Sequence, residues 1–161
     1  MHSVKNKFFL NIILIFSVFA LISAYFIQYI LGHQPCNLCL LERLPYLAAI
    51  ILISLIFILN KYEKLIILTV SLFFIFGTIV SFYHFGIEQG FFSESLVCNL
   101  SNNNTSLSAQ DLLKQLEKQT VSCKDVTFKV LGLSLATFNT IISLIISVIL
   151  LRIVVNYDKN K

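Results

Sequence analysis

The four cysteines are the residues of this 161-residue chain whose type and spacing point most directly to chemistry. Cys36 and Cys39 form a Cys-x-x-Cys motif, in which two close thiols favour a reactive redox pair. Cys98 and Cys123 lie farther apart, in a long polar stretch. Two disulfide-capable pairs are the simplest interpretation, and disulfides persist in an oxidising compartment such as the cell exterior. The cysteines therefore predict thiol–disulfide exchange.

Two other uses of four cysteines fit the spacing less well. Inert disulfide staples would gain little from Cys-x-x-Cys, because the closed loop is so short that its entropic benefit is minimal. A structural zinc site commonly has two close-spaced pairs, whereas the second pair here is wide, although His33 or His84 could complete a ligand set. We therefore expect no metal.

The composition places these cysteines in a membrane protein. Hydrophobic residues make up 57% of the chain, charged residues 12%, and the mean hydropathy is +0.85, which nearly excludes a soluble globular protein. The net charge of +4 is small and scattered, so we expect no nucleic-acid partner. The apolar runs suit crossings of a lipid bilayer, each needing about 20 residues. We expect an all-α membrane protein, a four-transmembrane-helix bundle forming a single integral membrane domain over residues 1–161.

The four expected spans are bounded by charged and polar connections. They cover about 8–31, 40–59, 65–86 and 130–155, with outer loops at about 32–39 and 87–129. The first run is longer than the core of a secretory signal, so we expect a retained anchor, with a signal cleaved near Ser23 and Ala24 as the alternative. In the second loop, Leu112, Leu113 and Leu116 have helical spacing and predict a short amphipathic helix.

The distribution of basic residues predicts the orientation. An even number of spans puts both termini on one side, and the short segments there and between the middle spans are rich in lysine and arginine. By the positive-inside rule these segments are cytoplasmic, which makes all four cysteines face outward. The basic residues concerned are Lys5, Lys7, Lys61, Lys64, Arg152, Lys159 and Lys161.

Three segments, QPCNLCLLER, YHFGIEQGFF and GLSLATFN, together resemble the disulfide-bond-formation protein B (DsbB) family. The resemblance covers nearly the whole chain. It implies a four-helix bundle in the bacterial inner membrane that oxidises a periplasmic thioredoxin-like dithiol oxidase (DsbA-like) and delivers the electrons to a quinone. Two departures from the common pattern are Phe138, where many relatives carry Trp, and Glu42, where many carry Gln.

The resemblance also implies an order of thiol exchange. The partner's thiolate attacks Cys98, the released Cys123 passes the reducing equivalents to Cys36, and Cys39 is left as the thiolate nearest the quinone. Ubiquinone and menaquinone both remain open. The alternatives are a vitamin K epoxide reductase-like quinone oxidoreductase, whose cysteines come in a different order, and a non-enzymatic structural or transport membrane protein with stapled loops.

Arg43 is a candidate for stabilising a thiolate and a quinone. If a helix starts between Pro35 and Leu38, Cys39 and Arg43 are four residues apart and share a face. A cation and a helix N-terminus both favour the thiolate over the thiol. The alternative is an arginine that snorkels to the lipid headgroups. We expect the adjacent Glu42 to be a solvated or ion-paired neighbour.

His84 is the second candidate quinone-binding residue. It lies at the outer end of the third span, where an imidazole could hydrogen-bond or protonate a quinone oxygen or simply anchor the helix at the interface. We expect His33 to be a loop residue and His2 to have no role. Four nearby phenylalanines could line a quinone pocket or face lipid, namely Phe82, Phe85, Phe91 and Phe92.

Overall fold

The computed structural model describes residues 2–59, 62–93, 98, 123, 129–130 and 133–157. Within them the helices and strands are α1 (His2–Tyr29), α2 (Asn37–Leu41), α3 (Leu44–Leu59), α4 (Glu63–Glu88), β1 (Lys129–Val130), β2 (Leu133–Ser134) and α6 (Leu135–Tyr157). The strands pair antiparallel, with Lys129 opposite Ser134. The amphipathic helix predicted around Leu112 to Leu116 lies outside the described residues.

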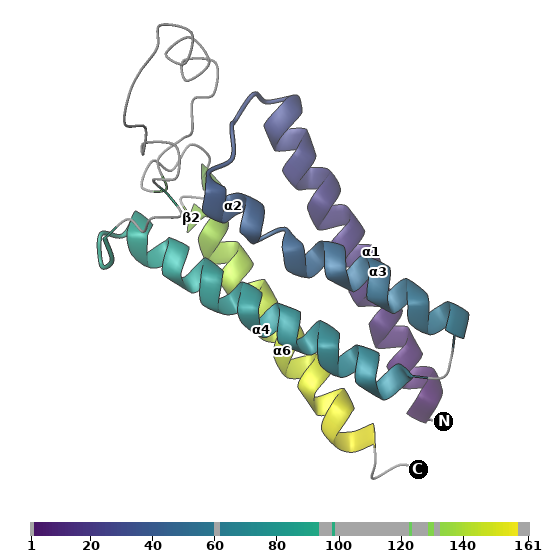
Figure 1. The fold of residues 1–161 in the computed structure, drawn as a ribbon. Helices are drawn as coiled ribbons and strands as arrows, with labels where there is room; N and C mark the ends of the chain where they lie inside the picture. The colour runs from purple at the N-terminus through teal and green to yellow at the C-terminus, as the bar shows by residue number, and fades with distance from the viewer. Residues whose placement is uncertain are drawn as a thin grey trace, which may run out of the picture.

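Among the described residues, four helical segments are long and apolar enough to cross a membrane, which confirms the predicted four-helix membrane bundle. They are Lys7–Tyr29, Asn37–Ile58, Glu63–Glu88 and Leu135–Tyr157, and the second combines α2 and α3. α1 packs on α3, α3 on α4 and α4 on α6. The start of α1 and the end of α6 lie at one end of the bundle, and α2 lies at the other (Figure 1).

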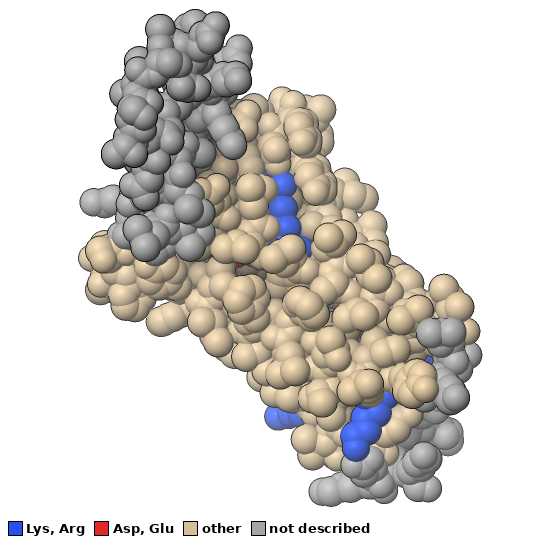
Figure 2. Space-filling view, viewed as in Figure 1, with Lys and Arg blue, Asp and Glu red and all other residues tan. Residues whose placement is uncertain are grey.

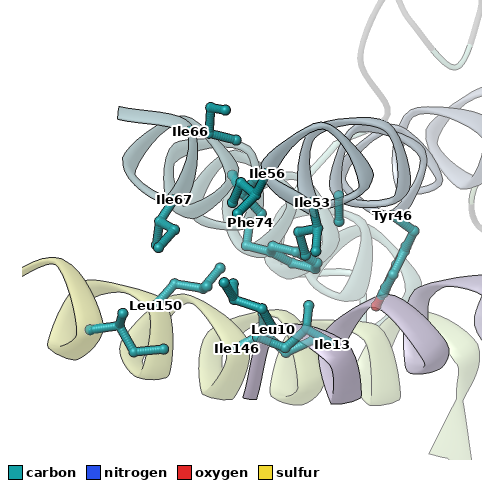
Figure 3. Close-up of a cluster of buried hydrophobic side chains, with 13 residues drawn as sticks. Leu10, Ile13, Tyr46, Ile53, Ile56, Ile66, Ile67, Phe74, Ile146 and Leu150 are labelled. Atoms are coloured by element: carbon teal, nitrogen blue, oxygen red, sulfur yellow. The ribbon is translucent and has the colours of Figure 1, made fainter. Parts of the chain in front are cut away.

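A buried apolar cluster holds the four long helices together toward the end of the bundle where α1 begins and α6 ends. Leu10 of α1, Ile53 of α3, Phe74 of α4 and Leu150 of α6 are fully buried in it (Figure 3). The outside of the bundle is also apolar, since each of the four long helices exposes large apolar side chains, among them Phe19, Ile58, Ile79 and Val155. On the face shown in Figure 2, little charge interrupts the length of the molecule. An apolar exterior is the surface that a hydrocarbon solvent requires.

The second span is broken into α2 and α3 by a proline. Pro45 has no N–H with which to bond the carbonyl of Leu41 four residues earlier, so the helical hydrogen-bond ladder is interrupted there. Across the break, the N–H of Arg43 bonds the carbonyl of Leu40, three residues back. The two thiols of the Cys-x-x-Cys motif therefore belong to a short helical turn that is separate from the long helix α3.

The C-terminal end of α4 is closed by a glycine. Gly90 has φ of +78°, and the N–H of Phe91 reaches back to the carbonyl of Gly86 at 2.8 Å while that of Gly90 bonds the carbonyl of Ile87 at 3.0 Å. These two bonds are the Schellman arrangement that ends helices. The chain then folds back, and the ring of Phe92 stacks on Tyr83 at 5.5 Å.

Candidate active site

Cys36 occupies the N-terminal cap of α2 and is almost fully buried, at 4% exposure. Its Sγ accepts a hydrogen bond from the N–H of Cys39 at 3.2 Å, and the two sulfur atoms are 2.6 Å apart. Both cysteines are free thiols in the structure. The cap position thus points a backbone donor at the Cys36 sulfur, and the helical turn brings the second thiol beside it.

These contacts lower the pKa of the Cys36 thiol from 9.0 to about 5. The largest cause is the hydrogen bond from the Cys39 thiol. His84 adds a hydrogen bond and a favourable charge, while burial opposes the shift. The geometry therefore favours Cys36 as the thiolate of the pair, whereas the family resemblance implies that Cys39 carries this form nearest the quinone.

The second cysteine pair lies against the first. Cys98 and Cys123 form a disulfide with their Cα atoms 5.8 Å apart. Both belong to one buried cluster with Cys36 and with Leu38 and Ile87. Cys98 is 6% exposed and Cys123 is 2% exposed. The disulfide is therefore packed among apolar side chains.

His84 on α4 lies between the first thiol and a carboxylate. Its Nε2 is 3.6 Å from Cys36 Sγ, and its Nδ1 is 2.7 Å from Oε1 of Glu42. Glu88, one turn further along α4, places Oε1 3.7 Å from His84 Nε2. The structure thus brings the predicted His84 together with the Cys-x-x-Cys motif, and it adds two carboxylates.

Glu42 makes more contacts in this site than the sequence analysis predicted. It is 8% exposed, in the turn between α2 and α3. Its Oε2 accepts a hydrogen bond from Nδ2 of Asn139 at 2.8 Å, and Oδ1 of Asn139 accepts one from the hydroxyl of Tyr46 at 2.5 Å. The burial of Glu42 contradicts the solvated neighbour expected from the sequence, and its carboxylate contacts His84 and Asn139 instead. An acidic residue directly before a membrane run was the available signal, because such a charge needs a partner.

Arg43 points toward α1. Its Nη1 donates to Oε1 of Gln28 at 2.7 Å, and its guanidinium lies 5.1 Å from the centre of the Tyr25 ring. A guanidinium over an aromatic face is favourable. Arg43 and Cys39 both line the cavity described next, so the arginine is close to the site without relying on the helical face expected from the sequence.

A cavity of about 250 Å³ connects these groups. Its apolar wall comes from α1 and α6, including Ala20, Ala24, Leu135 and Ile142. Its polar lining is formed by Cys36, Cys39, Cys123, Glu42, Arg43, His84, Glu88, Asn139, Tyr46, Gln34 and His33. An apolar slot with a few convergent polar groups is the usual form of a small-molecule site.

The phenylalanines considered as pocket walls do not line this cavity. Phe82, Phe91 and Phe92 are 56%, 77% and 44% exposed. Phe16, on α1, is the phenylalanine that contributes to the wall. His33, expected to be a plain loop residue, borders the cavity.

Three soft donor atoms lie close enough to share a metal ion. The sulfurs of Cys36 and Cys39 and a ring nitrogen of His84 are all within 4.8 Å of one another. This is a smaller set than the four ligands of structural zinc sites. The expectation that the protein uses no metal stays a prediction.

A buried redox-type cysteine pair beside a second cysteine pair, on a four-span bundle, defines a membrane thiol oxidoreductase. The family model for disulfide bond formation protein DsbB matches residues 6–153, so the chain belongs to the DsbB family. It is also similar to uncharacterized protein RP370 of Rickettsia prowazekii (strain Madrid E), with 30% identity over 154 residues, 94% of this chain and 89% of the relative. No solved structure matches the chain.

Proposed function

We propose that this protein reoxidises a periplasmic DsbA-like dithiol oxidase and passes the electrons to a membrane quinone. The observation that carries the proposal is that both cysteine pairs meet in one buried cluster and that three of the four cysteines also line the cavity. Family membership supports the chemistry of disulfide formation. The cavity supports a small apolar oxidant bound beside the thiols.

Thiol–disulfide exchange would carry the electrons inward. The partner's dithiol reduces the Cys98–Cys123 disulfide and leaves as a disulfide. The resulting Cys98 and Cys123 thiols then reduce a Cys36–Cys39 disulfide, and the first pair is restored. Each exchange is a thiolate attack on a disulfide sulfur through a mixed disulfide, so the sulfurs must come into contact. The shared cluster supports the second exchange, whereas the first requires Cys98 to become accessible to the partner.

The lining residues fit a quinone. Side chains of α1 and α6 offer an apolar wall for the ring and tail, and Arg43 offers hydrogen-bond donors at the polar end. His84 would offer a donor there once its Nε2 carries a proton. A bound quinone would supply an acceptor for two electrons and two protons. Arg43 would stabilise negative charge on an oxygen of that ring, and the Cys36–Cys39 pair would provide the electrons.

The localisation follows from the same proposal. The start of α1 and the end of α6 lie at one end of the bundle, and α2, which Cys36 caps, lies at the other (Figure 1). With the basic short segments in the cytoplasm, the cysteines face the periplasm of a bacterial inner membrane.

The test combines purified full-length protein with a reduced thioredoxin-like oxidase and either ubiquinone or menaquinone, and follows quinone absorbance. Turnover should be lost in both Cys36→Ala and Cys98→Ala, while Ser71→Ala, a change of a buried residue on α4, should retain it. Absence of turnover with every quinone would remove the proposal. Turnover that survives in Cys98→Ala would remove the two-pair relay.

A further inference from the structure

Glu42 is the meeting point of a buried hydrogen-bond network beside the thiols. One carboxylate oxygen contacts Nδ1 of His84 at 2.7 Å, and the other accepts from Asn139 at 2.8 Å. These partners come from α4 and α6, whereas Glu42 lies between α2 and α3. Burying a carboxylate is costly unless it is paired and hydrogen-bonded, and here both oxygens are partnered. A buried carboxylate held by side chains from two other helices points to a role beyond helix packing.

The network fixes which nitrogen of His84 faces the thiol. An ionised carboxylate can only accept hydrogen bonds, so the Nδ1 that contacts Glu42 must carry the proton and donate it. The other nitrogen, Nε2, is then the atom that can accept a proton, and it lies 3.6 Å from Cys36 Sγ. A histidine oriented by a carboxylate and facing a nucleophile is the general arrangement that activates a thiol or hydroxyl.

We propose that Glu42 is a positioning residue that orients His84 so that Nε2 takes the proton of the Cys36 thiol. This inference rests on the proposed function, in which the Cys36–Cys39 pair is oxidised by a quinone. When Nε2 accepts the proton, the sulfur of Cys36 becomes a thiolate and the imidazole becomes a cation. The negative charge of Glu42 then stabilises that cation.

The overall step is balanced. Two thiols lose two electrons and two protons, and the Cys36–Cys39 disulfide bond forms. Both electrons go to the quinone. One proton passes from Cys36 through His84 Nε2 to a quinone oxygen. The proton of Cys39 passes to solvent, and solvent provides the second proton that makes the quinol.

Other titratable groups surround the same thiol and must be considered. Cys39 faces it from α2, and His84 and Glu88 from α4, while Glu42 approaches from the turn. From α6, Asn139 contacts Glu42, and the hydroxyl of Ser143 donates to Oδ1 of Asn139 at 3.4 Å. The pKa of the Cys36 thiol is already lowered to about 5, partly by the hydrogen bond and charge of His84, which agrees with transfer to the imidazole.

The direction in which loss of Glu42 shifts the pKa of the Cys36 thiol separates this role from a direct charge effect. A carboxylate acting directly on a nearby thiolate would destabilise it, so neutralising the carboxylate would make the thiol more acidic. A carboxylate acting through His84 does the opposite. Loss of the carboxylate destabilises the protonated form of His84, so the Cys36 thiol becomes less acidic.

The experiment measures alkylation of Cys36 against pH, with no quinone or partner present. Full-length protein carrying Cys98→Ser and Cys123→Ser is reduced, treated briefly with iodoacetamide, and the adduct on Cys36 is quantified by mass spectrometry. In Glu42→Gln, the midpoint should move up by about 1 to 3 pH units. Glu42→Asp should restore part of the shift. Glu63→Gln is the matched control, because Glu63 lies at the other end of α4 from His84, and it should leave the midpoint unchanged.

The decisive comparison repeats Glu42→Gln in a His84→Gln background, where the upward shift should disappear. An unchanged or lowered midpoint in folded Glu42→Gln with His84 present would overturn the inference. So would an upward shift that persists without His84, because Glu42 would then act by another route.

If Glu42→Gln fails to fold, nitrogen NMR of histidine-labelled unsubstituted protein decides the question. His84 should carry a proton on Nδ1 in both redox states, and a bare Nδ1 would overturn the inference. These readouts are independent of turnover. If Glu42→Gln raises the alkylation midpoint as expected but the protein reduces no quinone, the proposed function is wrong. If the protein turns over quinone but Glu42→Gln leaves the midpoint unchanged, only the role of Glu42 is wrong.

Discussion

Gly77 of α4 lies directly against Pro45 of α3. A Cβ atom at Gly77 would be 2.6 Å from Cγ of the proline ring, closer than real carbon atoms approach. The glycine therefore lets the start of α3 pack onto α4 just below the turn that carries Glu42. This contact couples the packing of two spans to the position of the active-site turn.

Gly77→Ala should consequently destabilise the protein by about 1 to 3 kcal/mol, the usual cost of overpacking a filled interior. Thermal unfolding in detergent measures it, with Ile79→Ala as the control because Ile79 is 63% exposed. An unchanged unfolding temperature in Gly77→Ala would mean that α3 and α4 can separate without penalty.

The acidity of Cys36 predicts a specific pH dependence for the reduced protein. Because its folded pKa of about 5 is below the ordinary 9.0, the thiolate contributes stability that is complete above about 9 and is lost as the pH falls toward 5. Alkylation of Cys36 should stay near its plateau at pH 7 and fall with a midpoint near 5. A midpoint at the ordinary value would show that the thiol is not activated.

Neutralising Arg43 should weaken quinone use. A cation at about 4 Å from developing charge is worth on the order of 1 to 4 kcal/mol near a wet interface, so Arg43→Gln should lower the quinone-dependent rate roughly tenfold to several hundredfold. Arg43→Lys keeps the charge but cannot reproduce the planar fork that reaches Gln28 and Tyr25, so we expect an intermediate rate.

Quinone kinetics and membrane abundance of each arginine variant provide the measurement. Arg152→Gln, on α6 near the terminal end of the bundle, is the matched control. Normal kinetics for Arg43→Gln at normal abundance would make Arg43 an anchor between α1 and the turn.

Changing Cys123 to Ala should trap the partner on Cys98. Without Cys123 the mixed disulfide cannot be resolved internally, so the adduct accumulates and is visible on a non-reducing gel. Cys123→Ala/Cys98→Ala should form none. An adduct that forms through Cys36 instead would reverse the order of the relay.

The positive-inside orientation predicts that all four cysteines lie on the outer side of the membrane. After reduction, a membrane-impermeant thiol reagent should label Cys98 and Cys123 in intact spheroplasts as fully as in lysed ones. Labelling that occurs only after lysis would place the cysteines in the cytoplasm.

The spans and the cysteines could be predicted from sequence because their signals are local. Apolar runs require no knowledge of neighbours, and the Cys36-x-x-Cys39 spacing is visible in four residues. The position of Arg43 could not be predicted in the same way. A regular helix would align it with Cys39, but the interruption before Pro45 changes the path of the chain between them.

The network around Glu42 depends on packing between distant segments, so no local sequence pattern predicts it. His84 is 42 positions from Glu42, and Asn139 is 97 positions away. These contacts exist only once α4 and α6 have packed against the turn. The burial of the Cys98–Cys123 disulfide has the same origin, since a polar stretch of sequence gives no sign that its cysteines return to an apolar cluster.

That burial has a consequence for selectivity among reductants. Small thiols lack a surface with which to open the packing around Cys98 and Cys123. The cluster should therefore insulate the disulfide kinetically, and access would be granted by a partner that binds and exposes it. Under the proposed function, slow reduction of this disulfide by small thiols would limit the electrons that they pass to the quinone. The oxidising capacity of the quinone would then be used for protein folding.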